Sequence, residues 1–281
     1  MFVRKRVYIL VKTYPTISRK YAELVCTAGI LEDGSWIRLY PIPFRLLEDD
    51  QKFPKYTWIE VDVERNTKDF RPESYRPDIS TLSVEPKPHK VDWGARNSIL
   101  FKNTPVYTNL QTLISEAKSC DSYTSLAIFK PTKILNFVIE PDKREWDPEK
   151  LESLQAQSRQ LQLFKTIEEI EEEYRVVKKI PYKFSYTFLD DEGKRSKLMI
   201  EDWEIGMLYL NCLRRAKNNE DIAVQKVKEK YYNEFLEKDL YFFLGTTMQY
   251  HLKSPNPFII VGVYYPPHST GYQQMSLLDL T

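Results

Sequence analysis

Short apolar stretches and strand-like alternation dominate the start of the chain. The run at 7–11 is apolar throughout, which predicts a buried strand. Residues 23–30 and 36–40 are typical of a hairpin, because the acidic turn at 32–34 between them ends in glycine. Residues 56–64 alternate apolar and polar side chains and predict a further strand. We therefore expect a small β domain at the start of the chain.

The pattern changes in the middle of the chain. A helix is predicted at 109–118, and strands at 126–129 and 134–139 are assigned to the first domain. Asp147-Pro148-Glu149 is typical of a helix start, because Asp caps the helix and proline fits its first position. A Gln- and Glu-rich helical pattern follows, and we place a domain boundary there.

Strands return in the second half. Aromatic residues alternate with polar ones from 182 to 188, a turn at 190–193 ends in glycine, and 196–200 pairs back. Helices are predicted at 203–215 and 221–238, and closing strands at 240–245 and 257–265. The prediction is a β-rich α+β chain with four parts: an N-terminal β domain at 1–145, a helical linker at 146–176, a C-terminal β domain with two helices at 177–267, and a flexible tail at 268–281.

Composition narrows the class of protein. The 281 residues are 42% hydrophobic and 29% charged, which is typical of a globular protein. Because the net charge is only +1, binding to a polyanion has to come from a local patch, and the chain leans basic before residue 60. Three cysteines without a CxxC pair indicate neither a zinc ribbon nor a disulfide framework, so we expect a reduced, cytoplasmic protein. The apolar run at 7–11 is too short for a signal sequence or a membrane span, and we expect no membrane partner.

One strand face carries the strongest candidate chemistry. In the stretch 36–40, Ile37 and Leu39 point to one side, while Trp36, Arg38 and Tyr40 point to the other. Two rings around a guanidinium suit a single-stranded nucleic acid, because bases stack on rings and arginine binds phosphate or a base plane. The alternative is that the row packs beneath a second layer, with Arg38 in an ion pair.

The same region resembles a known family. Arg19-Lys20-Tyr21, Cys26-Thr27-Ala28-Gly29-Ile30 and the stretch from Gly34 to Pro41 are similar to the signature of the dual-OB-fold (DuOB) domain, except that Leu39 stands where that family tends to have proline. The resemblance implies two OB-like or small β-barrel modules and a nucleic-acid-binding role in prokaryotic conflict systems. It implies no catalytic residues. It favours the binding interpretation of the row, because OB-type barrels bind oligonucleotides across a strand face.

A proline-rich loop supplies further candidates. The stretch 70–78 contains Arg71, Tyr75 and Arg76 together with Glu73, and its two prolines exclude a helix. Such a loop could carry function, or it could be a surface loop fixed by its own Arg–Glu pair. The full set of expected nucleic-acid-binding residues is Arg19, Lys20, Trp36, Arg38, Tyr40, Arg71, Tyr75 and Arg76. The three histidines lack metal-ligand spacing and no Gly-rich phosphate loop is present, so we expect no catalytic residues, no metal and no cofactor.

Two short segments resemble the bacterial sliding-clamp-binding peptide. The tail holds Gln274-Met275-Ser276-Leu277-Leu278, and the linker holds a second copy at 160–164. Gln274, Met275, Leu277 and Leu278 would bind the clamp as a partner, with the amide and the apolar side chains as anchors. The alternatives are an arm that docks on its own domain for the tail, and an inward-packing helix face for the linker copy.

Together these patterns predict a binding protein and not an enzyme. We expect a nucleic-acid-binding module, for single-stranded or modified DNA or RNA, that acts as a recognition subunit in phage defence or DNA processing. The alternatives are a nucleic-acid-processing enzyme with its site in the loop 70–78, and an adaptor that docks on a sliding clamp or an effector.

Overall fold

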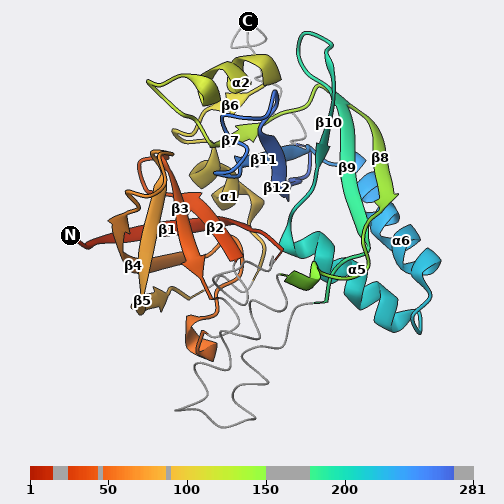
Figure 1. Cartoon of the computed structure of the whole chain (residues 1–281), viewed down its shortest axis with the longest axis horizontal. Coiled ribbons are helices and arrows are strands. Elements are labelled where there is room, and N and C mark those ends of the chain that lie inside the picture. The colour runs from red at the N-terminus through yellow and green to blue at the C-terminus, as the bar shows by residue number, and fades with distance from the viewer. Residues whose placement is uncertain (15–24, 44–46, 87–89, 150–177, 269–281) are drawn as a thin grey trace, which may run out of the picture.

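The computed structural model describes residues 1–14, 25–43, 47–86, 90–149 and 178–268. It confirms the β-rich α+β class: strands form most of the regular structure, with helices packed around them. Two modules lie side by side, a barrel built from the start of the chain and a mixed module built from the remainder (Figure 1).

The first module is a closed barrel. Its strands are β1 (Val3–Lys12), β2 (Val25–Ile30), β3 (Trp36–Ile42), β4 (Trp58–Arg65) and β5 (Ser74–Val84), and a short 3-10 helix (Asp49–Gln51) precedes β4. Their order around the barrel is β1-β2-β3-β5-β4, with β4 paired back to β1 and with β3 and β5 parallel. This arrangement is consistent with the OB-like module that the sequence predicted. Gly34, at φ 84°, closes the β2–β3 hairpin in a conformation that favours glycine.

The second module contains two sheets where we expected another small barrel. One sheet has the order β12-β11-β7-β6, and the other has the order β10-β9-β8. The strands are β6 (Val106–Tyr107), β7 (Leu126–Phe129), β8 (Lys133–Pro141), β9 (Tyr182–Leu189), β10 (Arg195–Met199), β11 (Tyr241–Thr246) and β12 (Phe258–Tyr264).

Four α-helices lie wholly within the described part of the chain. They are α1 (Trp93–Leu100), α2 (Leu110–Lys118), α5 (Trp203–Arg215) and α6 (Glu220–Lys228), which a π-helical segment (Glu229–Glu234) continues. The predicted helices at 109–118, 203–215 and 221–238 are confirmed, with Asn109, Asp202 and Asn219 as N-caps. In the described ranges no helix is both long and apolar enough to cross a bilayer.

Strand pairing divides the chain earlier than the boundary at residue 145 that we expected. β7 pairs with β11, and β8 pairs with β9, so both strands belong with the C-terminal half and not with the barrel. A local pattern can identify a strand but does not name its partner, which is why the sequence misplaced these two. Pro148 begins a helix, capped by Asp147, as expected. The linker after Glu149 and the tail after His268 lie outside the described residues.

An apolar layer joins the two modules. Ile37 and Leu39 fill the barrel interior, as the alternation predicted. The outward side chains of β1 to β3 pack against β7, β11 and β12, in a cluster that includes Tyr8, Leu10 and Phe243. The apolar run at 7–11 is therefore buried on both faces, inside the barrel and between the modules.

Candidate functional site

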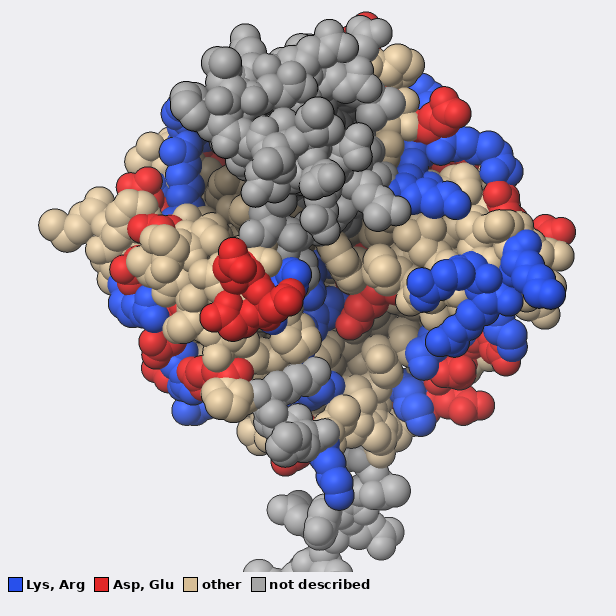
Figure 2. Space-filling model, turned by 90° about the horizontal axis from the view of Figure 1, so that it is seen from below, with Lys and Arg blue, Asp and Glu red and all other residues tan. Residues whose placement is uncertain are grey.

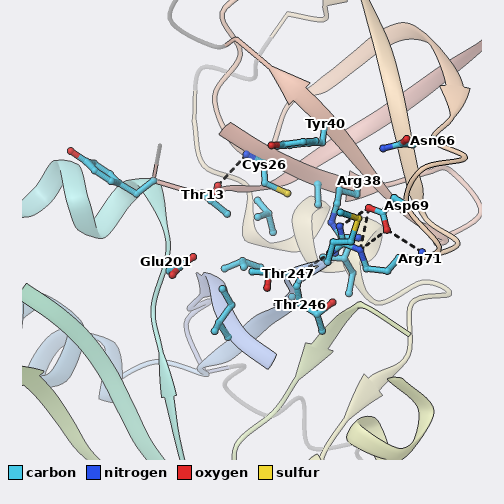
Figure 3. Close-up of a pocket in the computed structure, with 18 of the residues that line it drawn as sticks. Thr13, Cys26, Arg38, Tyr40, Asn66, Asp69, Arg71, Glu201, Thr246 and Thr247 are labelled. Atoms are coloured by element: carbon cyan, nitrogen blue, oxygen red, sulfur yellow. Dashed lines mark hydrogen bonds and ion pairs between the residues drawn. The ribbon is translucent and has the colours of Figure 1, made fainter. Parts of the chain in front are cut away.

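A cavity of about 320 Å³ opens where the apolar layer between the modules ends. Its walls come from β1 to β3 and the loop 66–73 on the barrel, and from β7, β12 and the end of β11 on the second module. Figure 3 shows Tyr40 and Cys26 on the barrel side, Thr246 and Thr247 on the opposite wall, and Glu201 at the far end from Arg38. The volume lies at the lower end of the range for small-molecule sites.

The loop 66–73 owes its shape to Arg65 at the end of β4. The Arg65 guanidinium donates to four backbone carbonyls, those of Asn66 (3.1 Å), Asp69 (3.3 Å), Arg71 (2.8 Å) and Ser74 (2.6 Å). Hydrogen bonds from one cation to successive carbonyls hold a loop without regular structure in a single conformation. The loop can therefore present Asp69 and Arg71 to the cavity in fixed positions.

Asp69 and Arg71 form a buried ion pair at the cavity wall. Arg71 Nε lies 2.9 Å from Asp69 Oδ1, and Nη2 lies 2.6 Å from Oδ2, so the contact is bidentate. Burial alone would raise the pKa of Asp69, but the Arg71 guanidinium outweighs it and lowers this pKa to about 2. Arg71 Nη1 also donates to the carbonyl of Thr246 at 2.5 Å, which ties the loop to β11 across the module interface.

Arg38 on β3 is a buried cation whose direct partners in the described chain are all neutral. Its residue is 2% exposed, and burial, followed by the charge of Arg71, lowers its pKa. Arg38 Nη1 donates to Ser125 Oγ at 2.8 Å and Ser74 Oγ at 3.3 Å, and Nη2 donates to the Ser125 carbonyl at 3.2 Å. Ser125 Oγ in turn donates to Glu73 Oε1 at 2.6 Å, so the hydroxyl relays Arg38 to a carboxylate. Among the described residues, none forms a direct ion pair with Arg38.

Glu201 brings a carboxyl group to the opposite end of the cavity. It follows β10, where its backbone N–H donates to the Ile260 carbonyl at 2.8 Å, and the next residue, Asp202, caps α5. Burial raises the pKa of Glu201. Its carboxyl oxygens make no hydrogen bond or ion pair with any residue that the structure describes.

The buried histidine near this site has a structural role. His251 Nε2 lies 2.6 Å from the Ala117 carbonyl and must donate to it, so Nδ1 accepts from the Thr246 hydroxyl at 2.7 Å. Burial lowers the pKa of His251, which keeps the ring neutral. His251 therefore orients Thr246 at the cavity wall. Within the described residues, no group of three or more His, Cys, Asp or Glu side chains is arranged to hold a metal ion.

The structure separates the predicted row on β3. Arg38 and Tyr40 line the cavity, and Tyr40 is 37% exposed. Trp36 instead packs edge-on against Phe243, with ring centroids 6.1 Å apart, inside the layer between the modules. The three side chains therefore do not form one open stacking platform, because the second module covers the first part of the row.

The other predicted residues are distributed as follows. Arg71 lines the cavity, whereas Tyr75 lies beneath the Arg65 guanidinium, and Arg76 faces Glu64 on the neighbouring strand. Residues Arg19, Lys20, Gln274, Met275, Leu277 and Leu278 lie outside the described part of the chain.

Two residues of the site were missed in the sequence. Glu201 precedes Asp202 in an acidic segment that is typical of a helix start. Asp202 does cap α5, whereas Glu201 lines the cavity. Ser125 carries no sequence signal, because only the pairing of β7 with β11 places it near Arg38.

Two family models match the chain. The model described as Domain of unknown function (DUF8758) matches residues 3–102, and the model described as Domain of unknown function (DUF8757) matches residues 106–281. Their junction falls between the barrel and the second module. A search of curated proteins gives no match.

Proposed function

This chain belongs to the family described as Domain of unknown function (DUF8757), whose description names no activity, and we propose its function from the cavity. The protein binds nucleic acid, and an unpaired nucleotide enters the space between the barrel and the second module. The observation that carries the proposal is the buried Arg38 on the cavity wall, which makes no direct ion pair with any described residue and reaches the Glu73 carboxylate only through the Ser125 hydroxyl. Burying a cation is costly unless it is paired, so an anionic or oxygen-rich ligand would satisfy it.

The position of the cavity on the barrel supports this function. OB-type barrels bind oligonucleotides on the face of their second and third strands and with the loops that follow the first and fourth strands. Here the cavity is lined by Cys26 and Ala28 of β2, Arg38 and Tyr40 of β3, and the loop after β4. The resemblance of residues 19–41 to DuOB domains supports the same role, that of a recognition subunit in phage defence or DNA processing.

The charge distribution supports a local mode of binding. Arg4 and Arg6, which contribute to the basic lean of the N-terminal region, are paired with carboxylates on the barrel surface. Lys68 and Arg38 are basic residues of the cavity lining. Figure 2 shows lysine and arginine side chains gathered on the second-module side of one face. A strand that enters the cavity would leave it across charged surface of this kind.

Fluorescence anisotropy with labelled single-stranded DNA and RNA tests the proposal. Arg38→Met should weaken binding roughly 10- to 100-fold, because a charge-assisted hydrogen bond contributes about 1.5–3 kcal/mol. Affinity should also fall steeply with salt, through counterion release. The matched control is Arg195→Met, which removes the same charge from an exposed position on β10.

Two results would contradict the proposal. If no single strand binds even at low salt, the nucleic-acid function is wrong. If Arg38→Met and Arg195→Met have equal effects in folded proteins, nucleic acid binds somewhere other than the cavity.

A further inference from the structure

One edge of the Arg38 guanidinium has no hydrogen-bond partner among the residues that the structure describes. Its three hydrogen bonds use Nη1 twice and Nη2 once, and two of them end on Ser125. The Nε–H and the second N–H of Nη2 lie together on the remaining edge, and no described residue accepts from either of them. Two parallel donors of this kind match a ligand that has two adjacent acceptors.

Glu201 presents the opposite chemistry across the cavity. Its carboxyl oxygens accept no hydrogen bond from the described residues, and Figure 3 shows it at the other end from Arg38. The exposed lining of the cavity is largely apolar and includes Val11, Ala28, Leu126 and Val261. A flat, mostly apolar ligand with acceptors on one edge and donors on another would satisfy both ends.

We propose that the cavity binds an unstacked guanine base, with O6 and N7 accepting from Arg38 and with N1–H and the 2-amino group donating to Glu201. This inference rests on the proposed function and names the nucleotide that enters the site. Paired O6 and N7 acceptors are the preferred partner of an arginine fork. Adenine places its 6-amino donor beside N7, where it would face the N–H groups of Arg38.

Cytosine is the closest competitor. Its O2 and N3 could accept from Arg38, and its 4-amino group could donate to Glu201. It offers a single donor group at that end, whereas guanine offers two neighbouring donors that suit both oxygens of a carboxylate. Thymine and uracil have one ring N–H between two carbonyl oxygens. When this N–H donates to Glu201, a carbonyl oxygen on either side of it also faces the carboxylate and is repelled.

The test uses thymidine 12-mers with one central substitution, measured by anisotropy against the wild-type protein. A central guanine should bind at least 10-fold more tightly than adenine, cytosine or thymine. Replacement of guanine by 7-deazaguanine removes the acceptor at N7, and replacement by inosine removes the 2-amino donor, so each should weaken binding several-fold. These analogues test the wild-type protein and need no substitution that could affect folding.

Two variants assign each loss to its residue. Arg38→Lys keeps the charge but not the two-donor edge, so this variant should no longer distinguish guanine from 7-deazaguanine. Glu201→Gln should no longer distinguish guanine from inosine, while keeping the sensitivity to 7-deazaguanine.

The outcomes separate this inference from the function on which it rests. Single-strand binding with no base preference, or with a preference for cytosine, overturns the guanine assignment and leaves nucleic-acid binding intact. An absence of any binding overturns both.

Discussion

The buried ion pair between the modules provides the sharpest test of how the cavity is held together. Lys55, in the segment before β4, places its Nζ 2.7 Å and 2.9 Å from the two Asp202 oxygens and 3.1 Å from Glu204 Oε2. The side chains of Lys55 and Asp202 are 3% and 0% exposed. Asp202 also caps α5, so one contact joins the barrel to the helix beside Glu201.

We expect Lys55→Met to destabilise the fold by about 3–5 kcal/mol, because removing one partner leaves a buried charge uncompensated. For a protein of this size the loss corresponds to a fall in Tm of roughly 6–20 °C. The measurement is thermal or urea unfolding followed by circular dichroism at pH 7.5. The matched control is Lys52→Met, which breaks an exposed pair with Asp49 and should change stability by less than about 1 kcal/mol.

The same variant has a signed pH dependence. Burial raises the pKa of Asp202 to about 6 even though Lys55 opposes the shift, and without Lys55 this pKa should rise further. When the pKa of a carboxyl group is higher in the folded state than in the unfolded chain, the folded state holds the proton more tightly. The free energy of unfolding therefore falls as pH rises toward and through the folded-state pKa. The deficit of Lys55→Met should therefore be larger at pH 8 than at pH 5.

A second substitution tests the assignment to Asp202. The double variant Lys55→Met with Asp202→Asn removes the buried charge but keeps a side chain that can cap α5, and it should recover much of the lost stability. If the free energy of unfolding of Lys55→Met lies within about 1 kcal/mol of the wild-type value, the pair does not hold the modules together, and the reasoning from burial is wrong.

Three further predictions address the site and the tail. Trp36→Ala should lower the free energy of unfolding by about 2–3 kcal/mol, because the ring packs on Phe243. An unchanged Tm in thermal unfolding would contradict this and would indicate that Trp36 is available to bind a ligand. The preference for guanine should fall as pH is lowered through the pKa of Glu201, which burial raises above the ordinary 4.5, and anisotropy should find no such fall in Glu201→Gln. Truncation after Thr270 should leave Tm unchanged and abolish capture of a purified bacterial sliding clamp, whereas unfolding would show that the tail is structural.

Local pattern identified most strands and helices, because alternation and capping depend on near neighbours. The hairpin at Gly34, the barrel-facing Ile37 and Leu39, and the cap at Asp202 all belong to this class. Helix α1, with its N-cap at Asp92, was missed, since the apolar residues of Trp93–Leu100 follow no clear helical period.

The site was only partly predictable, because it is assembled from segments that the chain order keeps far apart. Arg38 and Tyr40 were identified from their own strand, and Arg71 from its loop. Two further residues depend on pairing in the second module: Ser125, which binds Arg38 and precedes β7, and Glu201, which lies at the opposite end of the cavity. The burial of Trp36 could not be predicted for the same reason, since nothing near Trp36 in the sequence indicates that Phe243 of the second module packs against it.

The pairing of β7 with β11 also bears on how the chain folds during synthesis. All five barrel strands have been made once residue 84 leaves the ribosome, so the barrel can close early. β7 is complete at Phe129, but β11, which pairs with it, is not complete until Thr246. During that interval the apolar strand Leu126–Phe129 and the outer face of the barrel both lack their final cover, so the nascent chain exposes an unpaired strand edge to aggregation. Slower synthesis across residues 130–246 would lengthen this exposure, and a chaperone that binds extended apolar segments would act during the same interval.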